Sequence, residues 1–171
     1  MTTGSLRHQG FPNRTAAFAG VARFGKDPMP RPAPHRLLLD TYPRRTIIPT
    51  RFQDLDSMGH LNNVAYAALF EDARVRFNWS LGRMNRPDGF RAVVAMNSIN
   101  YLAEGSYPAD VEIATGVGHI GNRSYEILAV MHQDGRAIAT CDTVIVMTDP
   151  KEGGIPADYR AALEAHRIRA E

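Results

Sequence analysis

The sequence predicts a single α+β domain in which an antiparallel sheet wraps around one long helix. Three observations predict this fold class. One segment has a sustained helical period of apolar residues, four strand-like segments follow it, and a hairpin signal joins the last two of these. The chain has 171 residues, which suits one domain with one hydrophobic core.

The composition excludes several classes of protein. With 44% hydrophobic and 22% charged residues, the chain is typical of a globular protein. No stretch approaches the roughly 18 apolar residues that a membrane-spanning helix needs, so no membrane association is expected. A net charge of +2 is too small to indicate a nucleic-acid partner. The single cysteine, Cys141, cannot form an internal disulfide, and the expected compartment is a reducing cytoplasm.

The first part of the chain differs in composition from the rest. Residues 1–45 contain eight basic side chains and two acidic ones, and residues 1–40 mix Gly, Pro and Arg without a sustained apolar period. We therefore expect residues 1–40 to be a disordered extension and residues 41–171 to form the folded domain. A solvated tail, or translation that begins at Met29, is favoured over a targeting peptide, because Gly and Pro interrupt the amphipathic helix of such a peptide.

The folded domain is predicted to begin with a strand and a long helix. Residues 46–52 are rich in β-branched and aromatic side chains, which predicts a strand with Pro49 at an edge or bulge. After a polar turn, the helix covers residues 63–81, with Asn62 or Asn63 as its N-cap and Gly82 as its end. Its apolar face is marked by residues at i, i+4, i+7 and i+11, which are Tyr66, Phe70, Ala73 and Phe77.

The rest of the domain is predicted to be mostly strand. The strand candidates are residues 91–102, 109–119, 124–132 and 136–148. Asp134 and Gly135 lie between the last two candidates and form a strong type I′ hairpin signal. Pro156 stands at the start of a short closing helix over residues 157–169, which is rich in good helix formers.

The polar turn before the long helix carries the most specific motif of the chain. Residues 54–66 form an Asp-x-Asp-x-x-Gly-His-x-Asn-Asn-x-x-Tyr block. This block resembles that of the hotdog-fold thioesterases of the 4-hydroxybenzoyl-CoA thioesterase type, and plant acyl-carrier-protein thioesterases have a similar run. The resemblance extends over about residues 46–160 and includes the Ile-Pro-Ala-Asp-Tyr stretch at residues 155–159.

The resemblance implies a fold, an activity and an assembly. The fold is the hotdog fold, and the activity is that of an acyl-CoA thioesterase, which hydrolyses an acyl-CoA or acyl-carrier-protein thioester to a free acid and a thiol. The assembly is a homodimer or homotetramer with the substrate bound between subunits. The reaction implied needs no metal and no redox cofactor.

The residues of the motif also suit this chemistry by themselves. Thioester hydrolysis needs a base or nucleophile, and hydrogen-bond donors for the oxyanion that develops on the carbonyl. A carboxylate loop beside a helix N-terminus supplies both, because the first backbone N–H groups of a helix are unpaired. By resemblance, Asp56 is the catalytic carboxylate and the backbone N–H of Asn63 is the oxyanion donor. Asp56 either activates water or attacks the carbonyl to form an anhydride, and the sequence leaves both routes open.

Other polar residues of the motif have two interpretations each. His60 either takes part in catalysis, by polarising the carbonyl or holding the water, or is a partner in the turn. Asp54 is interpreted as a structural turn carboxylate; in the alternative arrangement it is the base and Asp56 orients it. Asn62 is interpreted as a helix cap, whereas Asn63 combines capping with a side chain that faces the site in the resembling enzymes.

Substrate-binding residues are predicted in two parts of the chain. Gly59 and Tyr66, within the motif, are expected in the substrate site. Arg123 and Ser124 lie in a turn between two predicted strands, a region that approaches the nucleotide phosphates or pantetheine in the resembling proteins. Arg123 is therefore either a phosphate partner or an ordinary exposed arginine.

Charged residues elsewhere have simpler interpretations. Glu71 is a second candidate carboxylate, because one branch of the family carries its carboxylate on the helix. Pairing at i, i+4, such as Asp72 with Arg76, is the simpler role for charges on this helix. His119 and His132 stand alone on strands, so no metal site is expected.

Two other functions are alternatives to hydrolysis. Hotdog hydratases that act on enoyl-CoA use an Asp and a His five residues apart. Here His60 follows Asp56 by four residues and follows Asp54 by six, which argues against hydration. A non-catalytic acyl-CoA-binding module is the other alternative, although the basic N-terminal region shows no helix-turn-helix pattern. The identity of the acyl group is left open.

Overall fold

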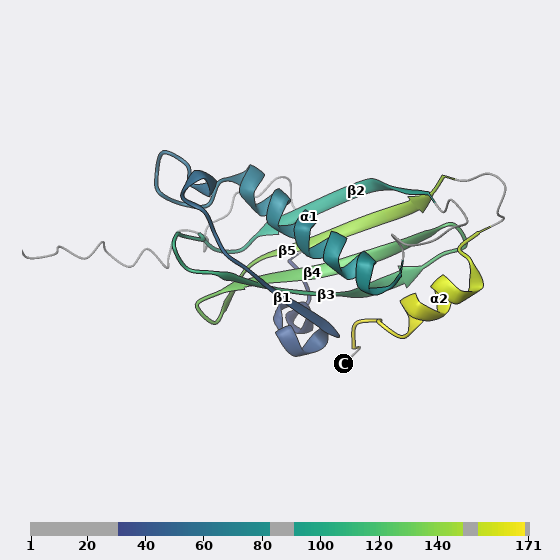
Figure 1. Cartoon of the computed structure of the whole chain (residues 1–171). Helices are drawn as coiled ribbons and strands as arrows, with labels where there is room; N and C mark the ends of the chain where they lie inside the picture. The colour runs from purple at the N-terminus through teal and green to yellow at the C-terminus, as the bar shows by residue number, and fades with distance from the viewer. Residues whose placement is uncertain (1–30, 83–90, 149–153, 170–171) are drawn as a thin grey trace, which may run out of the picture.

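The computed structural model describes residues 31–82, 91–148 and 154–169 (Figure 1). Over these ranges the architecture is α+β, with a five-stranded antiparallel sheet and two α-helices. No helix within them has the length and apolar character needed to cross a membrane. In chain order the elements are the 3-10 helices η1 (Pro34–Leu37) and η2 (Leu39–Thr41), β1 (Arg44–Ile48), the 3-10 helix η3 (Phe52–Asp54), α1 (Asn63–Ser80), β2 (Ala92–Tyr101), β3 (Val111–Ile120), β4 (Ser124–Gln133), β5 (Arg136–Met147) and α2 (Ala157–Glu164).

The five strands form one antiparallel sheet in the order β1-β3-β4-β5-β2. In the turn between β4 and β5, Asp134 has a φ of 51° and Gly135 a φ of 76°, as a type I′ turn requires. The hairpin predicted from this dipeptide is therefore confirmed. Among the described strands, β1 and β2 occupy the two edges of the sheet.

The first strand differs from the prediction of residues 46–52. β1 spans Arg44–Ile48 and pairs with β3, from Arg44 opposite Thr115 to Ile48 opposite Val111. Pro49 follows its last residue, and a proline has no N–H group for the sheet ladder. The chain leaves the sheet at this point and enters the loop that leads to α1.

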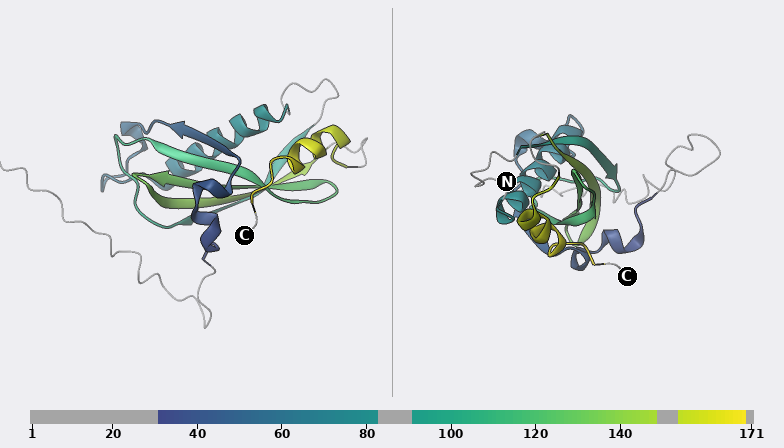
Figure 2. Two further views of the ribbon diagram at one scale, coloured as in Figure 1. Left: turned by 90° about the horizontal axis from the view of Figure 1, so that it is seen from below. Right: turned by 90° about the vertical axis from the view of Figure 1, so that its right-hand side faces the viewer.

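α1 packs along one face of the sheet, which Figure 2 shows curving beside the helix. Its bounds agree with the predicted residues 63–81, and Gly82 follows it with a φ of 78°. The side of the helix away from the sheet is exposed at Val64 and Trp79. The sheet of one chain therefore covers only one side of α1. The side that faces the sheet contributes the buried residues Ala65, Tyr66, Leu69, Phe70, Ala73, Arg74, Phe77 and Asn78.

A buried polar group joins α2 to the rest of the core. The hydroxyl groups of Tyr125 and Tyr159 lie 3.1 Å apart, and each donates to Asn78 Oδ1 at 3.2 Å. Buried polar atoms need such partners, and here the partners come from β4, α2 and α1. The contact fixes α2 beside the C-terminal end of α1.

α2 ends at Glu164, earlier than the predicted end at residue 169. The chain after it runs beside β3 instead of continuing the helix. The N–H of Val117 donates to the carbonyl of His166 at 2.8 Å, and the N–H of Ile168 donates to the carbonyl of Val117 at 2.9 Å. A long-range contact with the sheet thus overrides the local helix propensity.

Residues 34–41 fold onto the sheet, on the face opposite α1 (Figure 2). The guanidinium group of Arg36 donates to Asp142 Oδ1 at 2.6 Å and to the hydroxyl of Tyr42 at 2.9 Å. The predicted boundary at residue 40 is therefore corrected, since residues 34–40 are part of the folded domain. This stretch folds because it finds partners on the sheet, which local composition does not reveal. The remaining part of the predicted extension, residues 1–30, lies outside the described residues.

Candidate active site

A buried carboxylate, Asp54, holds the loop between β1 and α1. Its Oδ2 accepts a hydrogen bond from the backbone N–H of Arg51 at 2.8 Å, and its Oδ1 accepts one from the Arg51 guanidinium at 2.9 Å. Burial alone would raise the pKa of Asp54, but the hydrogen bonds from Arg51 outweigh burial and hold the pKa below its ordinary value. Both oxygens of this carboxylate are engaged, which favours the structural interpretation of Asp54 over that of a base.

Asp56 begins a tight turn that Gly59 closes. The carbonyl of Asp56 accepts from the N–H of Gly59 at 3.1 Å, and the N–H of Asp56 donates to the carbonyl of His60 at 2.8 Å. Gly59 has a φ of 81°, in the left-handed region where a residue with a Cβ atom is strained. The glycine of the motif is therefore needed for the shape of the turn.

The carboxylate of Asp56 is exposed and only half engaged. Its Oδ1 accepts hydrogen bonds from the backbone N–H groups of Met58 at 2.8 Å and His60 at 3.1 Å. The bond from His60 is the main cause that lowers the pKa of Asp56, so the group is ionised at neutral pH. Within the described residues, Asp56 Oδ2 has no hydrogen-bond partner, which leaves it available to a water molecule or a substrate carbonyl.

α1 begins beside this carboxylate. Asn62 is its N-cap, because Asn62 Oδ1 accepts from the backbone N–H of Ala65 at 2.8 Å. The capping role predicted for Asn62 is thus present. Asn63 is the first helical residue, and in the described part of the chain its backbone N–H has no partner. The unpaired amides and the positive end of the helix dipole meet at this tip.

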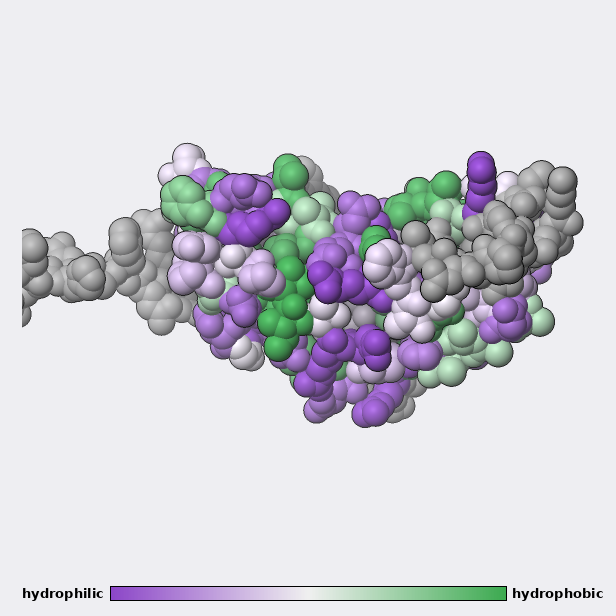
Figure 3. All heavy atoms as spheres, viewed as in Figure 1, coloured by the Kyte–Doolittle hydropathy of each residue, from purple (hydrophilic) through white to green (hydrophobic). Residues whose placement is uncertain are grey.

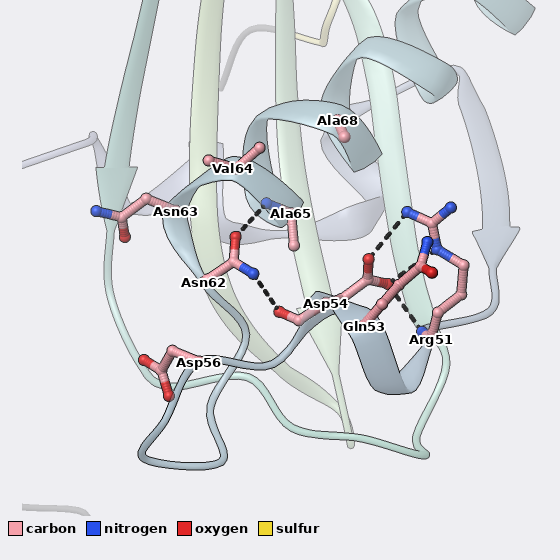
Figure 4. Close-up of a pocket in the computed structure, with 9 residues that line it drawn as sticks. All are labelled: Arg51, Gln53, Asp54, Asp56, Asn62, Asn63, Val64, Ala65 and Ala68. Carbon is pink, nitrogen blue, oxygen red and sulfur yellow. Dashed lines mark hydrogen bonds and ion pairs between the residues drawn. The ribbon is translucent and has the colours of Figure 1, made fainter.

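These groups line an open pocket of about 620 Å³ at the tip of α1 (Figure 4). Figure 4 shows Asp56 and Asn63 on one side of the helix tip and the pair of Arg51 and Asp54 on the other. The pocket is thus lined both by Asp56, with its exposed carboxylate, and by Asn63, the first residue of the helix, and a carboxylate and a helix N-terminal amide suit thioester hydrolysis. Its lining residues are Arg51, Gln53, Asp54, Asp56, Asn62, Asn63, Val64, Ala65 and Ala68.

The ring of His60 pairs with a residue outside the motif. His60 Nε2 lies 3.4 Å from Glu104 Oε2, on the segment between β2 and β3. The hydrogen bonds between His60 and Asp56 use backbone groups of His60. Its carbonyl accepts from the Asp56 N–H, and its own N–H donates to the Asp56 carboxylate. In one chain these contacts are those of a partner in the turn, and the catalytic role expected for His60 stays a prediction.

Tyr66 lies in the core, away from the pocket. Its hydroxyl donates to the carbonyl of Ala103 at 3.1 Å, and its ring makes an edge contact with Tyr101. Burial raises the pKa of Tyr66. In a single chain Tyr66 is a packing residue that ties α1 to the chain after β2.

Arg123 and Ser124 lie at the other end of the sheet from Asp56. The loop with Asp56 follows the end of β1, where Ile48 pairs with the first residue of β3, whereas residues 123–124 follow the last residue of β3. Ten residues of strand span roughly 30 Å. The turn is held by Arg160, whose guanidinium donates to the carbonyl of Gly121 at 2.7 Å. One chain therefore does not bring Arg123 and Ser124 to the pocket.

The structure also adds residues that the sequence did not single out. Arg51 and Gln53 line the pocket just ahead of the motif. The i, i+3 spacing of Arg51 and Asp54 was a local signal for their ion pair. Glu104 gave no such signal, because it lies far from His60 in the sequence and reaches it only through the fold.

The charged residues on α1 pair with one another. Asp72 and Arg76 form the predicted i, i+4 pair, with Arg76 Nε 3.0 Å from Asp72 Oδ2. Glu71 pairs with Arg74 at 3.1 Å and does not line the pocket, so its geometry supports the role of a surface charge. The described ranges contain no cluster of three or more His, Cys, Asp or Glu side chains that could hold a metal ion.

The fold and the pocket together define a class of protein. This α+β domain has a carboxylate loop at the tip of a long helix and an antiparallel sheet along that helix. This arrangement is of the hotdog type. A family model described as the thioesterase-like superfamily matches residues 50–165, and the chain belongs to this superfamily. The resemblance inferred from the motif is thereby confirmed.

Solved structures of three proteins agree with this assignment. The PA5185 protein from Pseudomonas aeruginosa strain PAO1 is 28% identical, with 79% of this chain and 99% of that chain covered and a TM-score of 0.69. A predicted thioesterase from Bacillus stearothermophilus is 28% identical, with coverages of 74% and 98% and a TM-score of 0.67. A thioesterase from Thermus thermophilus, complexed with coenzyme A and Zn, is 25% identical, with coverages of 73% and 94% and a TM-score of 0.65. No curated protein matches the chain.

Proposed function

We propose that the protein is an acyl-CoA thioesterase that hydrolyses an acyl-CoA, or an acyl-carrier-protein thioester, to a free acid and a thiol. The observation that carries this proposal is the free Oδ2 of Asp56 beside the N-terminus of α1 in one open pocket. Membership of the thioesterase-like superfamily supports it, as does the similarity to a thioesterase that binds coenzyme A.

The geometry suits two routes to the same products. In the first, Asp56 takes a proton from water while the water oxygen attacks the thioester carbonyl, and the sulfur leaves with a proton as the C–S bond breaks. In the second, Asp56 Oδ2 attacks the carbonyl, the C–S bond breaks and the sulfur leaves as a thiolate. Water then hydrolyses the resulting anhydride to the acid and the free Asp56 carboxylate, and the proton released from water goes to the thiolate. In both routes the backbone N–H of Asn63 stabilises the oxyanion.

The assembly that we propose is a homodimer or a larger oligomer that contains this dimer. β2 is an edge strand whose side chains Val93, Val94 and Met96 are about half exposed. Such an edge is suited to pairing with a second sheet. Antiparallel pairing of two copies of β2 would add a second sheet beside the first and give α1 a neighbour on its open side.

This pairing would also explain the distant position of Arg123 and Ser124. Each copy has one end of its sheet near Asp56 and an opposite end. A two-fold axis between the β2 strands places the Asp56 end of one copy beside the opposite end of the other copy. The turn at residues 123–124 lies at that opposite end. A site shared by two subunits could then combine the pocket of one copy with the turn of the other.

The proposed enzyme would work in a reducing cytoplasm and without a metal or redox cofactor. Its only cysteine, Cys141, is buried in β5, and burial raises the pKa of its thiol. A buried neutral thiol is a packing residue rather than a nucleophile. The chemistry proposed above uses only a carboxylate, a backbone amide and water.

The proposal is tested by thiol release from a panel of acyl-CoA and acyl-carrier-protein thioesters. The wild-type protein is expected to hydrolyse at least one member of the panel. Asp56→Asn removes the base or nucleophile, so its kcat should fall about 100-fold or more on that substrate. Glu71→Gln is the matched control and should retain the wild-type rate. Equal rates for wild type and Asp56→Asn would contradict the role of Asp56, and tight acyl-CoA binding without turnover would favour a binding module.

A further inference from the structure

A second pocket, of about 440 Å³, lies where β1 approaches the C-terminal half of α1. We call it the arginine pocket. Figure 3, in the view of Figure 1, shows hydrophilic residues gathered where these two elements meet. The residues that line the arginine pocket are Pro43, Arg44, Arg45, Thr46, Arg76 and Phe77.

Strand periodicity decides which side chains of β1 face into the arginine pocket. Ile48 is buried in the core against α1, and residues at alternate positions of a strand share a face. Arg44 and Thr46 therefore face α1 with Ile48. Arg45 alternates with them along the strand. It is among the lining residues, but its guanidinium pairs with Asp40 and with Glu112, the latter at 3.6 Å.

Several donors in the arginine pocket have no partner in the part of the chain that the structure describes. Within the described residues, the guanidinium of Arg44 and the hydroxyl of Thr46 have no hydrogen-bond or ionic partner. Arg76 uses its Nε on the two carboxylate oxygens of Asp72, at 3.1 and 3.0 Å, and its two terminal nitrogens have no partner in the same ranges. The pocket thus presents one complete guanidinium fork and the outer part of a second.

Two guanidinium groups with free donors are suited to one kind of ligand. Arginine binds phosphate oxygens through two parallel, charge-assisted hydrogen bonds, which a planar fork fits better than a point charge does. The carboxylate of Asp72 stays on the Nε side of Arg76, so an anion would approach from the terminal nitrogens. The hydroxyl of Thr46 adds a neutral donor on the same face.

The arginine pocket lies on the same side of α1 as the active-site pocket. Ala68 lines the active-site pocket and Arg76 lines the arginine pocket. Asp72 lies between them, four residues after Ala68 and four residues before Arg76. Eight helical residues correspond to about 12 Å along the axis. One elongated ligand could therefore occupy both pockets.

We propose that the arginine pocket is a binding site for a phosphate group, with Arg44 and Arg76 as its ligands. The phosphate comes either from the coenzyme A part of a thioester bound at Asp56 or from a free phosphorylated compound. The site itself does not depend on the proposed hydrolysis, since it is defined by donors that lie outside the active-site pocket.

The first experiment measures binding without turnover. Titration calorimetry with inorganic pyrophosphate and with coenzyme A, at low ionic strength, should show that Arg44→Gln and Arg76→Gln each weaken binding of at least one ligand about tenfold or more. Arg44→Lys should recover part of the loss, because it keeps the charge but not the fork. Arg91→Gln is the matched control, since Arg91 is exposed beside β2 at the other edge of the sheet and lines neither pocket, and it should change affinity less than about twofold.

The second experiment identifies the source of the phosphate. If it belongs to the substrate, Arg44→Gln should raise KM for an acyl-CoA and leave KM for the corresponding acyl-pantetheine unchanged. If it belongs to a free compound, Arg44→Gln should weaken pyrophosphate binding and leave both KM values unchanged. The proposal would be overturned if Arg44→Gln and Arg76→Gln bound both ligands with wild-type affinity. It would also be overturned if the wild-type protein bound neither ligand. The proposed hydrolysis would stand in either case, because it is measured separately.

Discussion

Two aspartates of one loop, Asp54 and Asp56, have different roles because their carboxylate oxygens have different neighbours. Asp54 is buried, and Arg51 occupies both of its oxygens. Asp56 is exposed, and among the residues that the structure describes the hydrogen-bond donors to its carboxylate all contact one oxygen, Oδ1. The sequence left both residues open as the base, because it does not show which carboxylate the side chain of Arg51 will reach. A free oxygen next to unpaired amides makes Asp56 the better candidate.

The pKa of Asp56 leads to a prediction for the pH dependence of the reaction. Hydrogen bonds from the loop amides lower this pKa, so the carboxylate is ionised above it and protonated below it. We expect kcat/KM to stay constant from neutral pH downward and to fall only below the ordinary aspartate pKa of about 3.9. The measurement is a pH profile of kcat/KM with circular dichroism at each pH, which separates loss of activity from unfolding. An acid limb above the ordinary aspartate range would contradict the role of Asp56 as the ionising group.

At the scale of elements, the site depends on where α1 begins. Asn62 caps the helix through Ala65 and also donates its side-chain amide to the carbonyl of Asp54 at 2.9 Å. The same side chain thus fixes both the first turn of the helix and the loop that precedes it. The positions of Asp56 and of the Asn63 amide are coupled through this residue.

Replacing Asn62 with alanine should therefore destabilise the protein. Loss of the N-cap should lower the free energy of unfolding by about 1 kcal/mol, within a range of roughly 0.5–2 kcal/mol, as measured by urea denaturation. Asn63→Ala is the matched control, because it keeps the backbone N–H and removes only an exposed side chain, so its free energy of unfolding should change by less than about 0.5 kcal/mol. An unchanged midpoint for Asn62→Ala would show that the cap does not fix the helix start.

The sequence predicted those elements whose signals are local. The apolar period of α1 and the Asp134-Gly135 turn are properties of neighbouring residues, and both features are present where they were expected. The end of α2 and the fold of residues 34–41 were missed, because contacts with the sheet determine both. The same distinction holds in the site. The loop and helix tip were predicted from one continuous motif, whereas the contact of His60 with Glu104 required the fold.

At the scale of the whole molecule, the open edge of β2 predicts an oligomer. Met96 is about half exposed on this edge strand, so Met96→Asp should place two like charges near the proposed two-fold axis and disrupt the dimer. Sedimentation analysis should give a mass of at least two protomers for wild type and a shift towards one for the variant. Ile47→Asp is the matched control, because Ile47 is exposed on the other edge strand, β1. A wild-type monomer with full activity would contradict the shared-site assembly.

The most direct test of the whole account is the single-turnover rate of thiol release by the Asp56→Asn protein, measured at saturating acyl-CoA beside wild type. The account predicts that this rate falls about 100-fold or more while the affinity for coenzyme A stays within about twofold, because the substitution removes the reacting oxygen and leaves the helix tip intact. A variant that releases thiol at the wild-type rate would contradict the account, since the carboxylate at the tip of α1 would then have no part in the chemistry.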